Sequence, residues 1–556
     1  MKSESVSDLS TSSEFIQSSV NAMMRRTKSC HSLKPKKNQV LICISGQKYK
    51  IVTEIARELQ WKLTNEHNLW NIFWTDSIMG VGFCLTMQRF QKINHFPGMM
   101  EICRKDLLAR NLNKMLKVFP EEYNIFPKTW SLPSNYADAL NYSLKHKNRT
   151  YIIKPAAAAQ GRGIYLTQNL KDINMDGMIC QVYLKKPLLI DGFKFDLRVY
   201  ALVTSLDPLR IYIYNEGLTR FATKPYALPT KANTGNAFMH LTNYSLNKHS
   251  ESFSSDKDKG SKRTFSSLNR ILSMNGYDVQ TLWNEIDEIV VKTVISALPV
   301  LKHNYSASFP RHDVMQACFE ILGVDIIIDE HFKPWLLEVN HSPSFSTSEY
   351  VDRKVKSGLV RDTFNLLGVN GTDRKNVLRD DQIRVKKRMT KLIRHPKEKQ
   401  SLRNRRQVQY ANELNETRAN CDQKQAEWEA NHLGGFRRII PVAGNPEKYR
   451  DLIEHQNTTS VYKETISTTQ KRQSAAMQRR AISANAVAPR PKPKKIGSDI
   501  PKNQFKSVDI GFLPNTIADW EEKERKMMMA SRAFLVESCG IRSAIHRDLM
   551  LNNCLC

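Results

Sequence analysis

Three oxygen-bearing side chains around one predicted hairpin have the spacing of a metal site. The sequence KPWLLEVNHSPSF, residues 333–345, carries an apolar run that ends on Glu338 and Asn340. Alternate residues of a strand point to the same face, and the turn at 329–333 folds Asp325 of the preceding strand back beside them. Two carboxylates and an amide oxygen form an all-oxygen site, which suits Mg²⁺ and not zinc.

The alternative is a sheet edge whose acidic residues are solvated. That interpretation suits Asp329 and Glu330 in the turn, whereas Asp325 and Glu338 are bracketed by apolar residues. A buried carboxylate is costly unless it is paired, hydrogen-bonded or bound to a metal. Because Mg²⁺ sites without histidine or cysteine usually have phosphates nearby, the hairpin predicts phosphate-binding segments elsewhere in the chain.

One such segment is YIIKPAAAAQGRGIYL, residues 151–166. Its small residues would let backbone N–H groups approach phosphate oxygens, and Lys154 and Arg162 could add positive charge. The pattern matches neither the Walker A motif nor the glycine fingerprint that opens a dinucleotide-binding helix. A flexible hairpin tip is the alternative, and this stretch alone does not exclude it.

A second charged segment is KFDLRVYALV, residues 194–203, which alternates Lys194, Asp196 and Arg198 with apolar residues. Strand alternation places the three charged side chains on one face. They face either solvent, as is common in antiparallel sheets, or an anion. The stretch MHLTNYSLNKHS, residues 239–250, is similarly rich in hydroxyls, amides and cations.

These residues are positioned by a mixture of predicted strands and helices. Apolar residues at helical spacing predict helices, and short apolar runs bounded by turn residues predict strands. The predicted helices span 49–63, 104–120 and 282–301, and the predicted strands lie at 39–45, 150–155, 178–184, 195–205, 210–223 and 321–340. The mixture predicts an α+β fold that ends near residue 368.

The charge balance implies an acidic partner. Lysine and arginine number 84 against 55 aspartates and glutamates, a net charge of +29. Such an excess suits nucleic acid, an anionic membrane or an acidic protein surface. The ten cysteines have no zinc or disulfide spacing, and we expect neither a signal peptide nor a membrane span. The sequence therefore predicts a reducing, intracellular environment.

Together, these stretches resemble the tubulin tyrosine ligase-like family of ATP-grasp ligases, and its polyglutamylase branch in particular. Matching blocks run in order over roughly residues 39–368 and include INHFPGM, KDLLARNL, IIKP, QGRGI, QVYL, DGFKFDLRVY, HLTNYSLNK, GVDIIID and LLEVNHSPSF. The segment that follows resembles the cationic microtubule-binding region of elongating, autonomous glutamylases. Between Arg374 and Arg406 it carries fourteen lysines and arginines against three acids.

The resemblance implies an ATP-grasp-like ligase core with a small N-terminal α/β domain, a basic helical extension and a largely disordered tail. The predicted parts are a disordered N-terminus at 1–37, a catalytic core at 38–368, a basic microtubule-binding region at 369–455 and a low-complexity tail at 456–556 with one helix near 517–538. Within the core, the N-terminal subdomain covers about 38–130, and the central and C-terminal parts cover about 131–368.

The resemblance also implies roles for individual residues. The implied magnesium ligands are Asp325, Glu338 and Asn340. The implied ATP contacts are Lys154, Gln160, Gly161, Gln181, Val182, Tyr183, Leu184, Lys194, Phe195, Asp196, Thr242 and Asn243. The implied contacts of the incoming amino acid are Arg220, Tyr244, Ser245 and Lys262. Lys154, Lys194, Arg198 and Glu338 are expected to act in catalysis, and His341 to contact the acceptor.

The loop before QGRG departs from the family pattern. Close relatives often carry polar or acidic residues where this chain has four alanines, Ala156 to Ala159. Backbone N–H groups survive that change, so phosphate binding by the loop is still expected, with reduced activity.

The function implied is an ATP- and Mg²⁺-dependent tubulin polyglutamylase. It would add L-glutamate to glutamate side chains of tubulin C-terminal tails through an acylphosphate intermediate, forming or elongating polyglutamate chains. Arg220 and Lys262 offer charge for the second carboxylate of glutamate, which glycine lacks. The alternatives are a glycylase or tyrosine ligase of the same fold, or a microtubule-binding protein on a catalytically dead ligase scaffold. The intact metal-ligand set favours an active enzyme.

The expected partners are tubulin or microtubules, through their acidic tails, and free L-glutamate. With the ligase core ahead of it, the basic segment suggests neither nucleic acid nor a membrane as partner, and we expect a monomer. A solvated helix and a nuclear-localisation run are the alternatives for that segment. The expected location is the cytoplasm and cytoskeleton, on microtubules of cilia, flagella or basal bodies.

Overall fold

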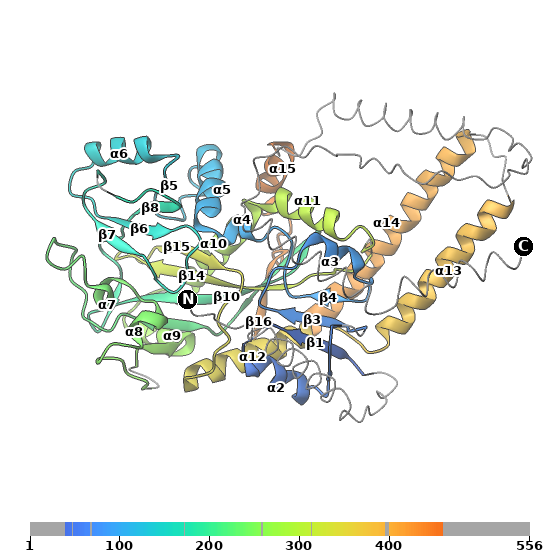
Figure 1. The fold of residues 1–556 in the computed structure, drawn as a ribbon, viewed down its shortest axis with the longest axis horizontal. Helices are drawn as coiled ribbons and strands as arrows, with labels where there is room; N and C mark the ends of the chain where they lie inside the picture. The colour runs from blue at the N-terminus through green and yellow to red at the C-terminus, as the bar shows by residue number, and fades with distance from the viewer. Residues whose placement is uncertain are drawn as a thin grey trace, which may run out of the picture. The chain divides into compact units, whose positions relative to one another are not determined.

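A computed structural model describes most of the chain up to residue 459 (Figure 1). The described ranges are 39–46, 48–66, 69–171, 173–256, 260–312, 314–394 and 400–459. The predictions for residues 1–37, and for the tail with its helix near 517–538, lie outside these ranges. Strands and helices are mixed along the described chain, which confirms the predicted α+β class.

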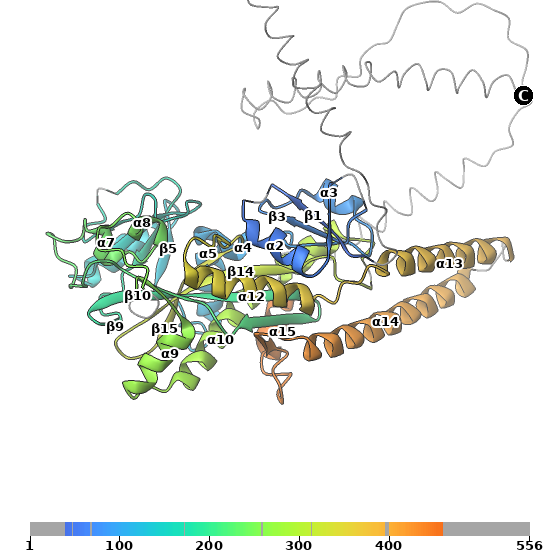
Figure 2. The ribbon, with the colours of Figure 1, turned by 90° about the horizontal axis from the view of Figure 1, so that it is seen from below.

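A small parallel sheet forms the N-terminal part (Figure 2). Its strand order is β2-β1-β3-β4, and the strands are β1 (Leu41–Ser45), β2 (Lys62–Thr64), β3 (Ile72–Thr75) and β4 (Lys92–Ile93). Helix α2 (Lys50–Glu58) connects β1 to β2, and the short helix α3 (Val81–Thr86) follows β3. The helix predicted over 49–63 is therefore too long, because its last residues pair with β1 as an edge strand that helical spacing does not reveal.

A second, antiparallel sheet carries the small-residue segment at 151–166, which the sequence suggested as a phosphate-binding loop. Its order is β5-β8-β6-β7, and the strands are β5 (Thr129–Ser131), β6 (Tyr151–Pro155), β7 (Tyr165–Thr167) and β8 (Met178–Val182). Helix α6 (Tyr136–Lys145) packs on this sheet beside Trp130 and Tyr151. The short α4 (Met100–Cys103) leads into α5 (Lys105–Val118), which ends just before Pro120 as predicted.

The third sheet has eight strands. It contains the hairpin that carries Asp325, Glu338 and Asn340, called the acidic hairpin below. Its main path is β13-β12-β10-β11-β16; β9 and β14 pair with β10, and β15 pairs with β14. The strands are β9 (Leu189–Ile190), β10 (Phe193–Leu206), β11 (Leu209–Tyr214), β12 (Leu218–Phe221), β13 (Lys262–Thr264), β14 (Glu320–Ile328), β15 (Pro334–Asn340) and β16 (Phe436–Ile440). Strand β10 pairs with β12, β14 and β11 along its length, so it is the common neighbour of the strands that carry Arg220 and Asp325.

Both faces of the large sheet are buried. Leu197 and Val199 of β10 belong to one apolar core with α10 (Val279–Ile295) and α11 (Leu298–Ser308). Tyr200 and Leu202, which alternate with them, belong to a second core with α12 (Tyr350–Leu366) and α2. Three shorter helices, α7 (Ala237–His240), α8 (Tyr244–Asn247) and α9 (Phe265–Met274), lie between β12 and α10 in the chain.

The helix predicted over 282–301 is divided in two. Helix α10 ends at Ile295, and α11 begins at Leu298, with Pro299 in its first turn. Proline has no N–H to donate to a carbonyl four residues earlier, but it is well tolerated in the first turn of a helix. The apolar spacing continues across the break, which is why the pattern alone predicted a single helix.

Two long helices follow the core and lie beside each other in both views (Figures 1 and 2). They are α13 (Asp373–Arg394) and α14 (Gln400–Asn431). The chain then returns to the large sheet, where β16 pairs with β11, and α15 (Arg450–Thr459) packs against α10 and α11. Glu429 near the end of α14 is only 1% exposed and accepts a hydrogen bond from the Tyr212 hydroxyl at 2.6 Å.

Within the described ranges, no helix is long and apolar enough to span a bilayer.

Candidate functional site

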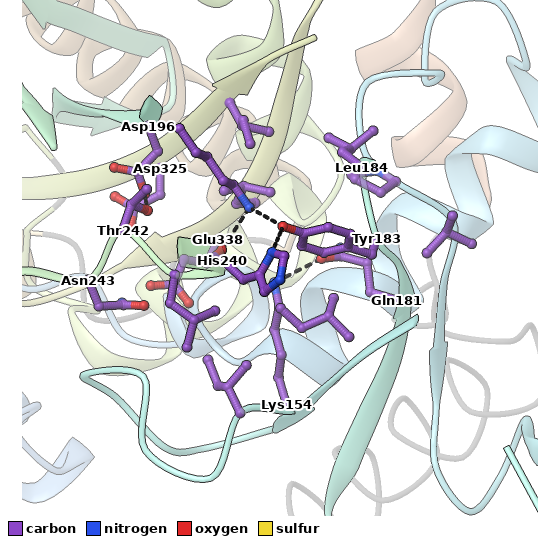
Figure 3. A pocket seen from close by; sticks show the side chains of 18 residues that line it. Lys154, Gln181, Tyr183, Leu184, Asp196, His240, Thr242, Asn243, Asp325 and Glu338 are labelled. Atoms are coloured by element: carbon purple, nitrogen blue, oxygen red, sulfur yellow. Dashed lines mark hydrogen bonds between the residues drawn. The ribbon is translucent and has the colours of Figure 1, made fainter. Parts of the chain in front are cut away.

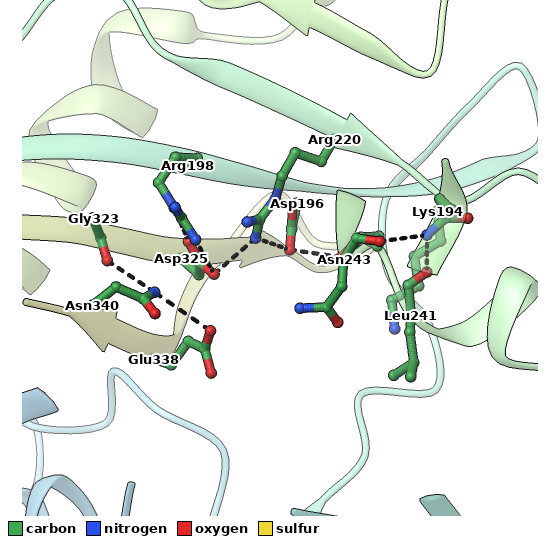
Figure 4. Close-up of polar contacts among 12 residues, drawn as sticks. Lys194, Asp196, Arg198, Arg220, Leu241, Asn243, Gly323, Asp325, Glu338 and Asn340 are labelled. Carbon is green, nitrogen blue, oxygen red and sulfur yellow. Dashed lines mark hydrogen bonds and ion pairs between the residues drawn. The ribbon is translucent and has the colours of Figure 1, made fainter. Parts of the chain in front are cut away.

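The hairpin brings Asp325 beside Glu338 and Asn340, as predicted to within about a residue, and a register shift between Asp325 and Ile326 sets the exact pairing. Asp325 of β14 lies directly opposite Glu338 of β15, and Gly323 lies opposite Asn340. The amide nitrogen of Asn340 donates to the Gly323 carbonyl at 3.3 Å and makes a weaker contact with Glu338 Oε1 at 3.4 Å (Figure 4). Side chains opposite each other on an antiparallel pair share a face, so the two carboxylates and the amide lie together.

Two arginines hold Asp325. The Arg198 guanidinium donates to both oxygens of Asp325, at 2.5 and 3.0 Å, and Arg220 Nη2 donates to Oδ2 at 2.8 Å (Figure 4). Strand pairing dictates these contacts, because Arg198 lies opposite Asp325 and Asp196 lies opposite Arg220. Arg220 also donates to both oxygens of Asp196, at 2.7 and 2.6 Å.

This pairing keeps the buried acid charged. Burial alone would raise the pKa of Asp325, but the charges and hydrogen bonds of Arg198 and Arg220 hold that pKa well below its ordinary value. Burial would likewise lower the pKa of Arg220, whereas Asp196 and Asp325 raise it well above its usual range. The charged face of β10 is therefore buried and internally paired, and the solvated alternative for Asp196 and Arg198 is wrong.

The donor atoms fit a hard cation. Among the described residues, no group of three or more histidine, cysteine, aspartate and glutamate side chains could hold a metal ion. The candidate set here is instead two carboxylates and one amide. Asn340 donates through its nitrogen, which leaves its carbonyl oxygen to accept, and Glu338 is the less buried acid, with 19% of its side chain exposed. Oxygen donors of this kind suit Mg²⁺.

A pocket beside the hairpin collects most of the predicted nucleotide residues (Figure 3). The predicted residues that line it are Lys154, Gln181, Val182, Tyr183, Leu184, Lys194, Asp196, Thr242, Asn243, Asp325 and Glu338. Phe195 does not line it, because strand alternation turns its ring to the opposite face, where it packs against Phe221 in the core. His240, which we did not predict, does line it.

Two buried lysines point into this pocket. Lys154 Nζ donates to Gln181 Oε1 at 2.8 Å, and Lys194 Nζ donates to the Tyr183 hydroxyl at 3.0 Å and to the His240 carbonyl at 2.8 Å (Figure 3). Burial lowers the pKa of Lys154 to about 8, although nearby Glu338 opposes the shift. Burial also lowers the pKa of Lys194 to about 7, against the charge of Asp196. An anionic ligand would raise both pKa values, because a nearby negative charge favours the protonated lysine.

The small-residue loop closes one side of the site. Gln160 and Gly161 both have a positive φ, at 66° and 77°. A Cβ on Gly161 would lie 2.7 Å from Leu246 and 3.1 Å from Asn243, so only glycine fits this close approach to α8. The Ser245 hydroxyl donates to the Gln160 carbonyl at 3.0 Å, which attaches the loop to α8.

Lys105 links that loop to the hairpin, and sequence reasoning missed it. Its ammonium donates to the Ala158 carbonyl at 2.9 Å and forms an ion pair with Glu338 at 3.2 Å. The KDLLARNL block contains this lysine. Helical periodicity explains the leucines of the block, whereas the first residue of a helix gives no periodic signal.

A second cavity, of about 390 Å³, adjoins the hairpin. The predicted residues that line it are Gln160, Arg198, Arg220, Asn243, Tyr244, Ser245, Lys262, Glu338 and Asn340. Asp352 and Lys356 of α12 also line it, and neither was predicted from the sequence.

His341, the predicted acceptor contact, is not among the lining residues of either cavity. Its ring lies 5.9 Å from the ring of His95, and burial together with the charge of His95 lowers its pKa.

Comparison with known proteins bears on these two adjoining cavities. Residues 84–377 match the tubulin-tyrosine ligase family, and this span is more than half of the chain. The chain belongs to the tubulin-tyrosine ligase family. The matched span contains the acidic hairpin, the first pocket and, apart from Tyr49, the lining of the second cavity, whereas β16 and α15 lie beyond it.

Curated relatives in this family carry a common description. The chain is 47% identical to "Tubulin polyglutamylase ttll6" of Danio rerio over 79% of its own length and 54% of the relative. It is 47% identical to "Tubulin polyglutamylase TTLL13" of Mus musculus, over 80% of the chain and 54% of the relative. Against the Homo sapiens protein of that name it is 42% identical, over 92% of the chain and 65% of the relative. The chain thus spans about half the length of the first two of these relatives.

Proposed function

We propose that this protein is an ATP- and Mg²⁺-dependent tubulin polyglutamylase with an ATP-grasp-like core. It adds L-glutamate to glutamate side chains in the C-terminal tails of tubulin. The observation that carries the proposal is the junction of two cavities at one acidic hairpin: a pocket with two buried lysines on one side, and an arginine-rich cavity on the other. Membership of the tubulin-tyrosine ligase family and the descriptions of its relatives support the same reaction.

In this proposal the lysine-containing pocket holds ATP. The strand end at residues 181–184 takes the base, and Lys154 and Lys194 face the phosphates. Asp325, Glu338 and Asn340 would hold Mg²⁺, which neutralises phosphate charge when bound. The pocket cations are buried, so their attraction to phosphate is screened less than that of surface lysines.

The reaction needs no enzyme nucleophile. The acceptor γ-carboxylate attacks the γ-phosphorus of ATP, the bond to ADP breaks, and an acylphosphate forms. The α-amine of free glutamate then attacks the acyl carbon, inorganic phosphate leaves, and the amine loses a proton as the amide forms. The contribution of the protein is to position the two substrates and to stabilise developing charge, here with Arg198, Arg220, Lys154 and Lys194.

The basic extension would deliver the acceptor. Exposed cations near the start of α13, such as Arg374, Lys375 and Arg379, belong to the segment with a net charge of +11. A cationic surface gathers glutamate-rich polyanions by long-range attraction that salt screens. We therefore propose a monomer that works on microtubules in the cytoplasm, including those of cilia, flagella or basal bodies.

The decisive assay incubates the purified chain with microtubules, Mg-ATP and, in separate reactions, labelled glutamate, glycine or tyrosine. We expect ATP-dependent incorporation of glutamate into tubulin tails. Incorporation of glycine or tyrosine in place of glutamate would overturn the polyglutamylase assignment. Binding to microtubules without incorporation of any label would favour a catalytically dead scaffold.

A further inference from the structure

A groove of about 1070 Å³ lies between helices α5 and α6, with strand β5 between them (Figure 1). None of the residues that line it belongs to the two cavities at the acidic hairpin. The lining residues of α5, from Asp106 to Lys117, recur at helical spacing and form one face of that helix. Those of α6, from Asp138 to Lys145, form one face of the opposite wall.

The two helices run in the same direction along this groove. At one end, the Ser131 hydroxyl of β5 donates to the carbonyl of Asp106 in the first turn of α5, at 3.4 Å, and the chain enters α6 a few residues later. At the other end, the ammonium of Lys128 lies 4.6 Å from the ring centroid of Tyr142 in α6. Asn113 of α5 donates to the backbone carbonyl of the residue after Lys128, at 2.9 Å. Both helices therefore end near Lys128.

This arrangement gathers four exposed lysines at one end of the groove. They are Lys114 and Lys117 of α5, Lys128 just before β5, and Lys145 at the end of α6. We call the channel that they line the lysine groove. The helix dipole favours a cation in the last turn of a helix, which accounts for Lys117 and Lys145 one by one. It accounts neither for Lys114 and Lys128 nor for the meeting of all four.

The other charges of the lysine groove are mostly matched within the protein. Asp106 pairs with Arg104 at 2.8 Å, and Arg110 pairs with Glu101 at 2.6 Å. Asp138 is the one further acid among the described lining residues. Four lysines against this aspartate leave the groove with an excess of three positive charges.

The lysines have no acidic partner among the described residues. Lys128 Nζ lies over the rings of Tyr142 and Trp130, at 4.6 and 5.7 Å from their centroids, and Lys114 makes a weak contact with Gln456 at 3.5 Å. Trp130 is only 6% exposed, so its ring supports the Lys128 ammonium and offers little surface on which a nucleic-acid base stacks. An open groove with surplus charge and no stacking surface favours an extended acidic peptide over a nucleic acid.

We propose that the lysine groove binds the part of a glutamate-rich tubulin tail that lies outside the active site. The inference rests on the proposed function, in which such a tail is the acceptor. The start of α5 adjoins the site, because Lys105 pairs with Glu338 at 3.2 Å. From Lys105 the helix rises about 18 Å to Lys117, a distance that an extended peptide covers in about six residues. One tail therefore has the length to place its acceptor glutamate at the hairpin and its acidic stretch on the lysines.

The test compares two acceptor peptides in steady-state kinetics with the full chain, L-glutamate and Mg-ATP. A glutamate-rich peptide of about twelve residues reaches both the hairpin and the lysines, whereas one of about four residues does not. The double variant Lys117→Glu, Lys145→Glu reverses two exposed charges, so we expect its KM for the long peptide to rise roughly tenfold at low salt. Its KM for the short peptide, its KM for ATP and its kcat should change little.

The matched control is the double variant Lys171→Glu, Lys224→Glu. Both lysines are exposed and lie outside the groove, and the two reversals change the net charge of the chain by the same amount. The KM of this control for the long peptide should equal that of the wild type. An equal rise in the control would mean that net charge alone acts on the peptide, and the proposal would be wrong.

Direct binding identifies the occupant of the groove. Fluorescence anisotropy in the absence of ATP measures the affinity for the labelled long peptide and, separately, for a single-stranded RNA with the same number of negative charges. We expect Lys117→Glu, Lys145→Glu to bind the peptide roughly tenfold more weakly than the control variant does. If the reversal weakens RNA binding and leaves peptide binding unchanged, the groove is a nucleic-acid site and the proposal fails.

The remaining outcomes separate this inference from the proposed function. An unchanged KM for the long peptide, or an equal rise in the KM for the short one, would overturn the role of the lysine groove. Failure of the wild type to incorporate glutamate would instead overturn the proposed function, and the anisotropy measurement would still decide whether the groove binds an acidic peptide.

Discussion

The chain concentrates positive charge in two regions that differ in how each charge is held. In the core, Arg220 is 8% exposed and contacts two carboxylates, and Lys194 is 6% exposed with two hydrogen-bond acceptors. On α13, Arg374 and Arg379 are exposed to solvent. A buried charge interacts strongly with a few fixed partners, whereas an exposed ion pair contributes only about 0–1 kcal/mol. Single residues should therefore decide the chemistry, and only groups of residues should decide docking.

The largest effect is expected from one half-buried acid of the hairpin, Glu338. Glu338→Gln removes a charge from the hairpin without changing its shape, so ligation should fall below detection while the fold is kept. Glu330→Gln, in the exposed turn of the same hairpin, should leave activity at the wild-type level. Incorporation of labelled glutamate measures activity, and thermal unfolding monitors the fold. Normal turnover by Glu338→Gln would show that Glu338 is not needed for catalysis.

A smaller effect is expected from four cations of α13 together. Reversing Lys386, Lys387, Arg388 and Lys391 to Glu changes the charge of the basic segment from +11 to +3, because each reversal removes two positive charges. Microtubule co-sedimentation should weaken, roughly tenfold to a hundredfold at low salt, because many weak contacts add together. Raised salt should weaken the wild type in the same way.

The same variant separates docking from chemistry. Its activity on a short soluble glutamate peptide should fall far less than its microtubule binding, because the core is unaltered. The single change Lys386→Glu serves as the matched control and should have little effect on binding. If the quadruple variant binds microtubules normally at moderate salt, the segment is a solvated helix and not a docking surface.

The smallest effect concerns pH. Burial lowers the pKa of Lys194 to about 7 and that of Lys154 to about 8, so both lose their charge as pH rises from 6.5 to 8.5. ATP prefers the protonated lysines, and its affinity should therefore weaken roughly tenfold over this range, with proton uptake on binding. Calorimetry in buffers of different ionisation enthalpy measures both quantities. An affinity that is constant across this range would mean that neither lysine faces the phosphates.

Much of the fold and of the site could be predicted from sequence because the signals are local. Alternation along β10 and β15 determined which residues share a face, and Pro120 marked the end of α5. The short turn brought Asp325 to within a residue of Glu338, but a register shift between Asp325 and Ile326, which the sequence does not reveal, places the two acids directly opposite each other. The break between α10 and α11 was missed because apolar spacing continues across it.

The sequence by itself determined the ligand types, the order of the motif blocks and the sign of the charge in each region. Only the tertiary structure decided which charges are paired. Arg198 and Asp325 are separated by 127 residues, and Lys262 and Asp352 by 90. Periodicity reports the face on which a residue lies and carries no information about the strand or helix that will cover that face. The pairing of β10 with β14, and the packing of α12 near β13, turned scattered charges into buried ion pairs.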